Sequence, residues 1–278
     1  MNQVFGYIRF SFLGRSDTRL SRRVSDDEER FRILYDPLRM EQRFYFFEKI
    51  TLPSIRAQTD KDFRILVVSS EVMPDEYKQR LNSLTADIPQ IEVIYSSAEH
   101  VTYEINPRLK EMTAGLTENT VHFRLDDDDA ICSDMISLLR GCANRARENE
   151  LLSFPRGFFL TMHDGKAHLL RKFEPYIAIA WAYVNKPGQI RSPYQGMHNV
   201  AYQYVPSMLD PKPLAYIHVS HDASDTRMRV KEKLSRAMQY DPKFMTEIEQ
   251  EKIQQRVAEY FPSFTAESLK QIIENAPQ

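Results

Sequence analysis

Four consecutive aspartates, Asp126 to Asp129, are the residues of this sequence whose type and spacing point most directly to chemistry. They follow the apolar segment 121–125, which has the composition of a buried strand. Aspartates at a helix N-terminus cap free N–H groups and interact favourably with the helix dipole, which accounts for one or two of them. Adjacent carboxylates repel one another, and a divalent cation would relieve that repulsion. The run therefore allows two interpretations, a helix cap and a metal site.

The reaction suited to such a metal site is the departure of a nucleoside diphosphate. Bound Mg²⁺ or Mn²⁺ would stabilise the leaving group as a Lewis acid, with one or two protein carboxylates in the metal shell. If the run is extended, Asp126 and Asp128 project to one face and Asp127 points away. Asp129 would then cap the next helix or bind the donor sugar.

The first half of the sequence alternates strand-like and helix-like segments. Strands are predicted at 4–12, 63–70, 91–95 and 121–125. A capping-box pattern at 25–28 and a proline at position 74 predict two of the helix starts. This alternation indicates a parallel sheet with right-handed crossovers and helices on both faces. Ligands bind such sheets at the carboxyl ends of strands, where both segment 10–11 and the acidic run fall.

The second half has shorter elements. Strands are predicted at 151–160, 167–172 and 214–219, with Gly- and Pro-rich sequence at 187–196. Beyond about residue 230 the chain becomes charged and helical, with apolar faces at helical spacing. We therefore expect one α/β domain over 1–228 and a C-terminal helical extension over 229–278.

Several motifs resemble one family. Leu125 and the acidic run resemble the Asp-x-Asp signature of GT-A glycosyltransferases, in its Leu-Asp-x-Asp-Asp form. Segment 51–63 is similar to that group's lead into its second strand. With segments 9–11 and 35–39, the chain resembles the bacterial rhamnosyltransferase family over most of residues 3–225. The resemblance implies a GT-A-like fold, with a mixed, mainly parallel sheet flanked by helices. It also implies a nucleotide-sugar donor, a divalent metal (Mn or Mg) and an acceptor hydroxyl on a glycan or another molecule.

Site residues carry over by position. Asp126 and Asp128 match the Asp-x-Asp pair, as metal and donor ligands, and Asp129 matches the following acid. Three residues fall where the first strand of such a fold meets the nucleotide: Arg9, Phe10 and Ser11. The resemblance predicts rhamnose as the donor sugar less strongly than it predicts the fold, because donor sugars diverge readily on one fold.

Two histidines near the end of the last strand, His218 and His221, are candidates for a third metal ligand, which GT-A enzymes often take from this region. The alternative for each is a strand-end histidine that hydrogen-bonds a backbone carbonyl. Of the two histidines, we favour His218 as the metal ligand. Arg124 precedes Asp126 by two residues and has the bidentate fork that holds an aspartate or a phosphate. Its alternative role is a structural ion pair.

An inverting reaction would need a general base. Asp222 is favoured by its neighbours among several acids of suitable type, which also include Asp164, Glu174 and Asp225. A retaining mechanism stays open. Trp181 lies in an apolar stretch, so a core position is preferred over stacking on an acceptor sugar.

Composition narrows the class of protein. The 278 residues carry a net charge of −2, which provides no global basic field for nucleic acid. Apolar content of 42% and charged content of 27% are ordinary for a globular chain. No apolar stretch approaches the roughly 20 residues that span a bilayer, and the N-terminus reads as a first strand. Cys132 and Cys142 would be roughly 15 Å apart on a helix, too far for a disulfide. We therefore expect reduced cysteines in a cytoplasmic protein.

Two other functions compete with glycosyl transfer. A nucleotidyltransferase also uses paired aspartates and a metal, but usually has a Gly- and basic-rich loop after the first strand. Here that loop has the single glycine Gly14. A non-catalytic nucleotide-sugar-binding protein is the other alternative, and intact Asp126 and Asp128 count against it.

Overall fold

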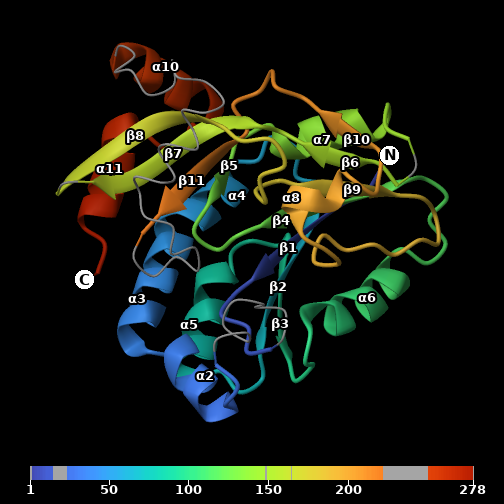
Figure 1. The fold of residues 1–278 in the computed structure, drawn as a ribbon, viewed down its shortest axis with the longest axis horizontal. Coiled ribbons are helices and arrows are strands. Elements are labelled where there is room, and N and C mark those ends of the chain that lie inside the picture. The colour runs from blue at the N-terminus through green and yellow to red at the C-terminus, as the bar shows by residue number, and fades with distance from the viewer. Residues whose placement is uncertain (1, 15–23, 148, 164, 222–249, 278) are drawn as a thin grey trace.

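The computed structural model describes residues 2–14, 24–147, 149–163, 165–221 and 250–277 (Figure 1). A seven-stranded sheet has the order β10-β6-β9-β4-β1-β2-β3, and a four-stranded sheet has the order β5-β11-β7-β8. The larger sheet is mixed and mainly parallel, and helices flank it, as predicted.

Strand β1 (Val4–Arg9) lies at the centre of the larger sheet, parallel to β2 (Arg64–Ser70) and β4 (Thr120–Leu125). Strand β3 (Ile91–Ser96) continues the parallel set. Successive side chains of these strands enter two separate cores, one under α6 and one on the opposite face. Burial on both faces explains the near-continuous apolar sequence of β2, whereas β3 is only partly buried and β4 has His122 and Arg124 among its apolar residues.

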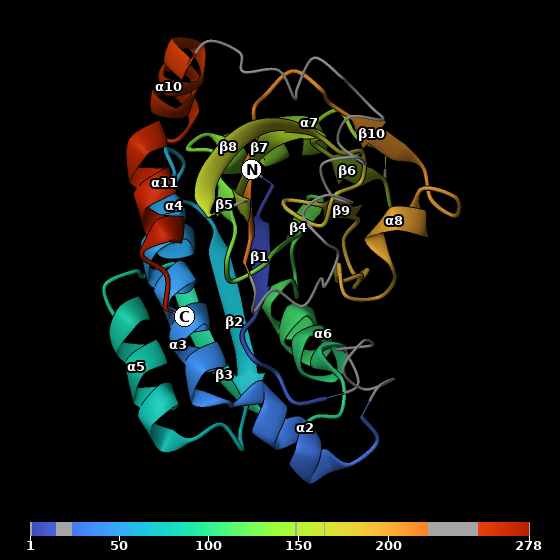
Figure 2. The same cartoon turned by 60° about the vertical axis from the view of Figure 1, so that its left-hand side comes forward.

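Helices cover the two faces of the parallel strands (Figure 2). One face carries α3 (Pro37–Phe46), α5 (Asp75–Thr85) and α7 (Met135–Ala143), and the other carries α6 (Val101–Met112). Pro37 and the side chain of Asp36, which accepts the N–H of Arg39, start α3. Helix α2 (Asp27–Leu34) is capped by Asp26 rather than by the predicted Ser25 box.

A helical segment continues from α3 through a π-helical turn, η1 (Phe47–Thr51), into α4 (Leu52–Arg56). Pro53 stands in the first turn of α4, where a residue without an N–H is tolerated. The helical backbone is therefore continuous from Pro37 to Arg56, and Pro53 does not interrupt it.

The second half of the chain builds the far edge of the larger sheet and all of the smaller one. The predicted strand 151–160 is two strands, β6 (Leu151–Ser153) in the larger sheet and β7 (Arg156–His163) in the smaller one. Strand β9 (Ala182–Asn185), antiparallel to β4 and β6, was not predicted, and β10 (Ser207–Leu209) pairs with β6. The smaller sheet also contains β5 (Ala130–Ile131), β8 (Lys166–Phe173) and β11 (Tyr216–Ser220), while α8 (His198–Ala201) lies outside both sheets.

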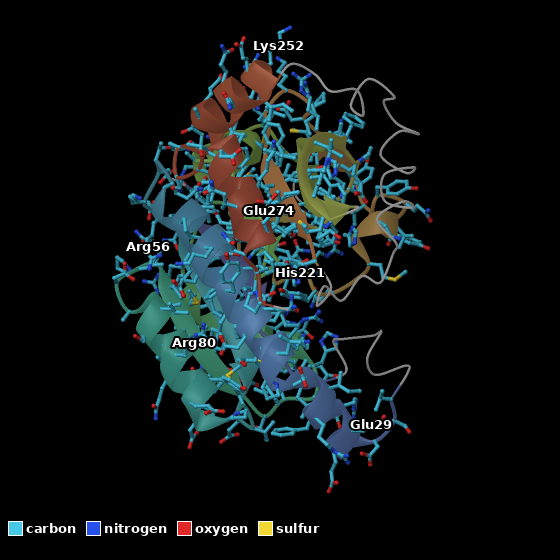
Figure 3. All side chains as sticks on the ribbon, turned by 90° about the vertical axis from the view of Figure 1, so that its left-hand side faces the viewer. Glu29, Arg56, Arg80, His221, Lys252 and Glu274 are labelled. Atoms are coloured by element: carbon cyan, nitrogen blue, oxygen red, sulfur yellow. The ribbon has the colours of Figure 1, made fainter. Side chains whose placement is uncertain are left out.

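Helices α10 (Gln250–Tyr260) and α11 (Ala266–Glu274) close the fold beside the smaller sheet and α3 (Figure 3). Phe261 contacts Phe158 of β7, with ring centroids 6.1 Å apart. Tyr45 of α3 donates to the carbonyl of Ile272 at 2.9 Å. These contacts attach the predicted helical extension to the α/β domain. The predicted boundary at 228/229 lies outside the described residues.

A buried histidine makes stability depend on pH. His122 of β4 bonds the Tyr7 hydroxyl through Nδ1 and the Thr120 hydroxyl through Nε2, both at 2.7 Å, and burial lowers its pKa from 6.5 to about 3. Below pH 6.5 the unfolded chain gains a proton that the folded chain does not, so stability falls as pH falls towards 3. We expect wild type to lose about 2 kcal/mol more than His122→Gln between pH 7.5 and 5, in urea unfolding. An identical loss in both proteins would contradict this account.

Candidate active site

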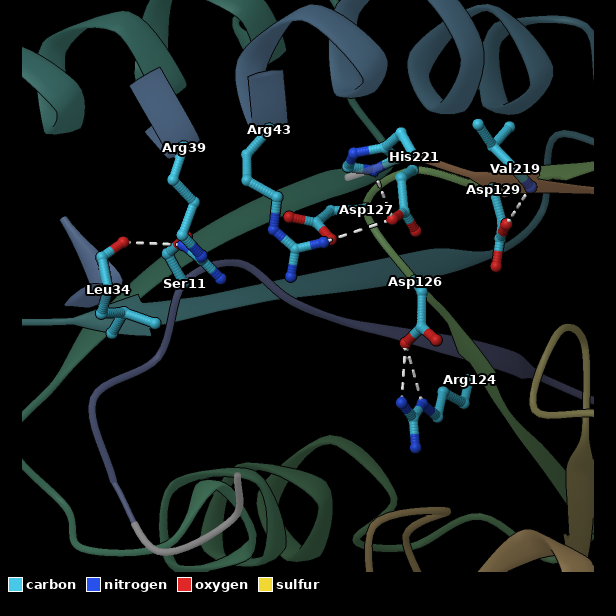
Figure 4. Close-up of polar contacts among 11 residues, drawn as sticks. Ser11, Leu34, Arg39, Arg43, Arg124, Asp126, Asp127, Asp129, Val219 and His221 are labelled. Atoms are coloured by element: carbon cyan, nitrogen blue, oxygen red, sulfur yellow. Dashed lines mark hydrogen bonds and ion pairs between the residues drawn. The ribbon is translucent and has the colours of Figure 1, made fainter. Parts of the chain in front are cut away.

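The acidic run connects the two sheets. It leaves β4 at Leu125 and enters β5, which pairs antiparallel with β11, so that residues 126–129 lie beside the carboxyl end of β11. The Asp129 N–H contacts the carbonyl of Asp126 at 3.4 Å across a turn. Because the run turns, the extended backbone that would project Asp126 and Asp128 to one face is not present. Asp127 and Asp128 point towards α3, whereas Asp126 points away from it (Figure 4).

Asp126 and Arg124 form an ion pair on the side away from α3. Two guanidinium nitrogens of Arg124 lie 3.0 and 2.8 Å from one Asp126 oxygen. The guanidinium also lies over the Tyr194 ring, 5.1 Å from its centroid. The Asp126 side chain is 34% exposed, and its three neighbours in the run are buried. The structure pairs Arg124 with Asp126, and this contact is part of both roles that the sequence left open for Arg124.

Asp127 and Asp128 meet a buried arginine of α3. Arg43 lies 2.9 Å from Asp127 and 3.3 Å from Asp128, and each of the three side chains is less than a tenth exposed. His221 Nε2 lies 3.0 Å from the same Asp128 oxygen that Arg43 contacts. Its ring stacks on Phe46 of α3 at 4.2 Å. Asp128 is thus shared between a helix cation and an imidazole from the end of β11.

The two predicted histidines have different surroundings. His218 lies within β11, where its Nδ1 contacts the Lys172 ammonium and its ring lies 5.3 Å from Phe159. His221 follows the strand end and reaches the acidic run. Of the two candidates, His221 contacts the acidic run, whereas His218, which the sequence favoured, contacts Lys172.

Asp129 is buried and bonded to β11. Its carboxylate accepts the Val219 N–H at 2.9 Å, so it fastens β11 to the run and does not cap α7, which begins at Met135. Burial, together with the charges of Asp128 and Asp126, holds the pKa of Asp129 well above its usual range. Asp222, the other predicted catalytic acid, lies outside the described residues.

The predicted donor residues at the end of β1 have mixed environments. Phe10 is fully buried and packs on Phe44 at 4.9 Å, so any donor contact at this position falls to its backbone. Ser11 has a left-handed backbone, with φ of 45°, and its hydroxyl accepts from Arg39 at 3.0 Å. Arg9 is the last residue of β1. Positive φ in a residue other than glycine is costly and often accompanies function.

The sequence did not predict Arg43 as a site residue or Arg39 as the partner of Ser11. They are four residues apart and so lie on one side of α3. The available signal was two arginines at this spacing among the buried residues Met40 and Phe44. Tyr194, under Arg124, had no comparable signal because it lies in an irregular segment.

Two features are absent from the part of the chain that the structure describes. No three or more His, Cys, Asp or Glu side chains come together as a metal cage. No helix is long and apolar enough to cross a membrane. Both cysteines are free, as predicted, and both are buried.

A mixed, mainly parallel sheet with an acidic run at the end of a central strand is the arrangement expected of a GT-A-like transferase. The chain belongs to the family described as "putative rhamnosyl transferase", whose profile matches residues 3–233. Family membership makes the protein a glycosyltransferase and confirms the predicted family resemblance.

Solved structures with a similar course of chain have low identity to this one. TarS residues 1–349 from S. aureus, in complex with UDP, has 11% identity and a TM-score of 0.38, over 79% of this chain and 61% of that one. A "putative glucose-1-phosphate thymidylyltransferase" from Bacillus anthracis, in complex with a sucrose, has 11% identity and a TM-score of 0.38, over 85% and 94%. A "putative nucleotide-diphospho-sugar transferase" from Desulfovibrio desulfuricans G20 has 11% identity and a TM-score of 0.33, over 86% of this chain and 99% of that one. Among curated proteins, none matches this sequence.

Proposed function

We propose that the protein transfers a sugar, with rhamnose as the first candidate, from a nucleotide diphosphate to a hydroxyl of a glycan or another acceptor, with the help of a divalent metal. The observation that carries the metal assignment is the approach of Asp128 and His221, whose facing atoms are 3.0 Å apart. They come from the ends of two different strands, so the fold itself brings them together.

The residues present fit a divalent ion. Mg²⁺ is commonly held by one or two protein carboxylates, with substrate phosphates and waters as its other ligands, so a complete protein cage is not required. Asp128 would supply the carboxylate and His221 the imidazole. When bound, the ion would offset the negative charge that grows on the departing diphosphate.

The remaining residues of the run have separate proposed tasks. Asp126, the most exposed of the four aspartates, lies beside Arg124. Its proposed task is to accept hydrogen bonds from hydroxyl groups of the donor sugar. Arg124 fixes that carboxylate and adds positive charge on the same side. Asp129 fastens β11, which orients His221, and Asp222, the next residue in the sequence, is kept as the candidate general base.

A donor screen tests this function. Nucleoside diphosphate release is measured for uridine, guanosine and thymidine diphosphate sugars, including the rhamnosyl donor, with Mn²⁺, with Mg²⁺ and with EDTA. We expect slow hydrolysis of one donor class in the presence of metal and none in EDTA. Release that persists in EDTA would remove the metal from the proposal. If no donor is turned over or raises the melting temperature, the transferase proposal fails.

The compartment is part of the same proposal. Two free, buried cysteines fit a reducing environment, so we propose that the protein acts in the cytoplasm, where nucleotide sugars would supply the donor.

A further inference from the structure

Arg43 is a permanent cation at the point where the proposed metal would bind. Its side chain is 6% exposed and projects from α3 towards Asp127 and Asp128 (Figure 4). A buried guanidinium must be paired, because its desolvation is costly. The structure pairs it with two carboxylates of the acidic run.

One guanidinium nitrogen of Arg43 contacts both carboxylates, at unequal distances. Arg43 is 2.9 Å from Asp127 and 3.3 Å from Asp128, and Asp127 is the more buried of the two acids, at 1% exposure. The Asp128 oxygen that faces Arg43 also faces His221. Asp127 therefore has the geometry of a fixed anchor, whereas Asp128 is shared between partners.

The backbone that carries Arg43 is held in place. One turn earlier on α3, Arg39 bonds the Ser11 hydroxyl at 3.0 Å and the Leu34 carbonyl at 2.7 Å. Tyr45 and Gln42 of the same helix bond backbone carbonyls of the C-terminal tail. A change of partner at the acidic run is therefore confined to the Arg43 side chain.

We propose that Arg43 is a built-in counter-ion that competes with the divalent metal for Asp128. In the metal-free protein it compensates Asp127 and Asp128 together. When a metal binds Asp128, Arg43 keeps Asp127 and gives up Asp128. This inference rests on the proposed function only in that Asp128 is the metal ligand.

Two opposite effects follow from the charges. In Arg43→Gln, two carboxylates lose a neighbouring cation, so the metal-free protein is less stable and Mn²⁺ binds more tightly. In Asp127→Asn, the charge of Arg43 is no longer shared with Asp127, so it acts more strongly on Asp128 and Mn²⁺ binds less tightly. Opposite or like unit charges about 4 Å apart interact strongly enough at a protein surface to change affinity by about tenfold or more.

The experiment is a titration with Mn²⁺ alone, without donor, followed by isothermal calorimetry and by the shift in melting temperature. Wild type, Arg43→Gln, Asp127→Asn and the double variant are compared. Arg56→Gln is the matched control, because Arg56 is also paired with an aspartate, Asp87 at 2.7 Å, but on an exposed surface. We expect about tenfold tighter binding in Arg43→Gln, about tenfold weaker binding in Asp127→Asn, and near wild-type affinity in the double variant and the control.

The measured Mn²⁺ affinities decide whether Arg43 competes with the metal. Weaker binding in Arg43→Gln would mean that Arg43 only scaffolds Asp128, and unchanged affinity in both single variants would mean no competition, so either result overturns the inference. Absence of Mn²⁺ binding in wild type would overturn the metal proposal itself and the inference with it. Asp127→Asn retains Arg43 and carries the sign of the effect even if Arg43→Gln fails to fold.

Discussion

Replacing Asp128 by asparagine is expected to lower metal-dependent turnover of the donor about a thousandfold. The substitution keeps the shape of the side chain but removes the carboxylate that, with His221, is proposed to hold the metal. Metal stabilisation of a leaving group contributes several kcal/mol to the transition state, and about 4 kcal/mol corresponds to a thousandfold in rate. Nucleoside diphosphate release at saturating Mn²⁺ measures the loss, and a Mn²⁺ titration should show weakened binding in parallel.

The matched control is Asp87→Asn, which removes an exposed carboxylate paired with Arg56. It should retain wild-type turnover and Mn²⁺ affinity. If Asp128→Asn keeps both turnover and Mn²⁺ binding near wild type, the metal binds elsewhere. If turnover is unchanged although Mn²⁺ no longer binds, the reaction does not need the metal.

The parallel strands could be predicted from the sequence because short segments rich in β-branched and aromatic residues alternate with helical and turn-forming segments. Each of the four predictions overlaps the observed strand, although β1 ends at Arg9 and not at residue 12. The position of the acidic run at the end of β4 followed from the same pattern. The local alternation of strands and helices was therefore enough to bring the run to the ligand-binding edge of the sheet.

The geometry within the run could not be predicted, because it depends on contacts between distant parts of the chain. The turn at 126–129 is set by the pairing of β5 with β11, some ninety positions later in the sequence. The same pairing decides that His221 rather than His218 reaches Asp128. Arg43 approaches Asp127 only because α3 packs against the strand end, and no local pattern encodes that approach. Strand β9 was missed for a different reason, because its four residues are too few to show a clear hydrophobic period.

Two buried arginines, Arg43 and Arg140, are paired with aspartates in this fold, and their surroundings give them different roles. Arg43 faces an acidic run that is shared with a histidine at a strand end. Arg140 of α7 is 5% exposed and faces Asp60, at 2.9 Å, and the backbone carbonyls of Asn2 and Asp62. Its partners belong to the start of β1 and to the segment that leads into β2. Arg140 therefore connects three parts of the chain at the edge opposite the proposed active site.

Replacing Arg140 by methionine is expected to cost about 3 kcal/mol of folding stability, because breaking a buried pair leaves its partners uncompensated. Although burial alone would raise it, the hydrogen bond and charge of Arg140 hold the pKa of Asp60 below its usual value, so this contact stabilises the ionised carboxylate. The loss should appear in urea unfolding, and as a fall of about 5 °C or more in melting temperature.

The companion variant Arg140→Met/Asp60→Asn separates the ion pair from packing, since it removes the stranded charge and should recover part of the loss. Both variants should keep wild-type Mn²⁺ affinity, in contrast to Arg43→Gln, because no partner of Arg140 belongs to the acidic run. A changed Mn²⁺ affinity in Arg140→Met would mean that the acidic run depends on how α7 is anchored. The separation between an arginine that stabilises the fold and one that sets metal affinity would then fail.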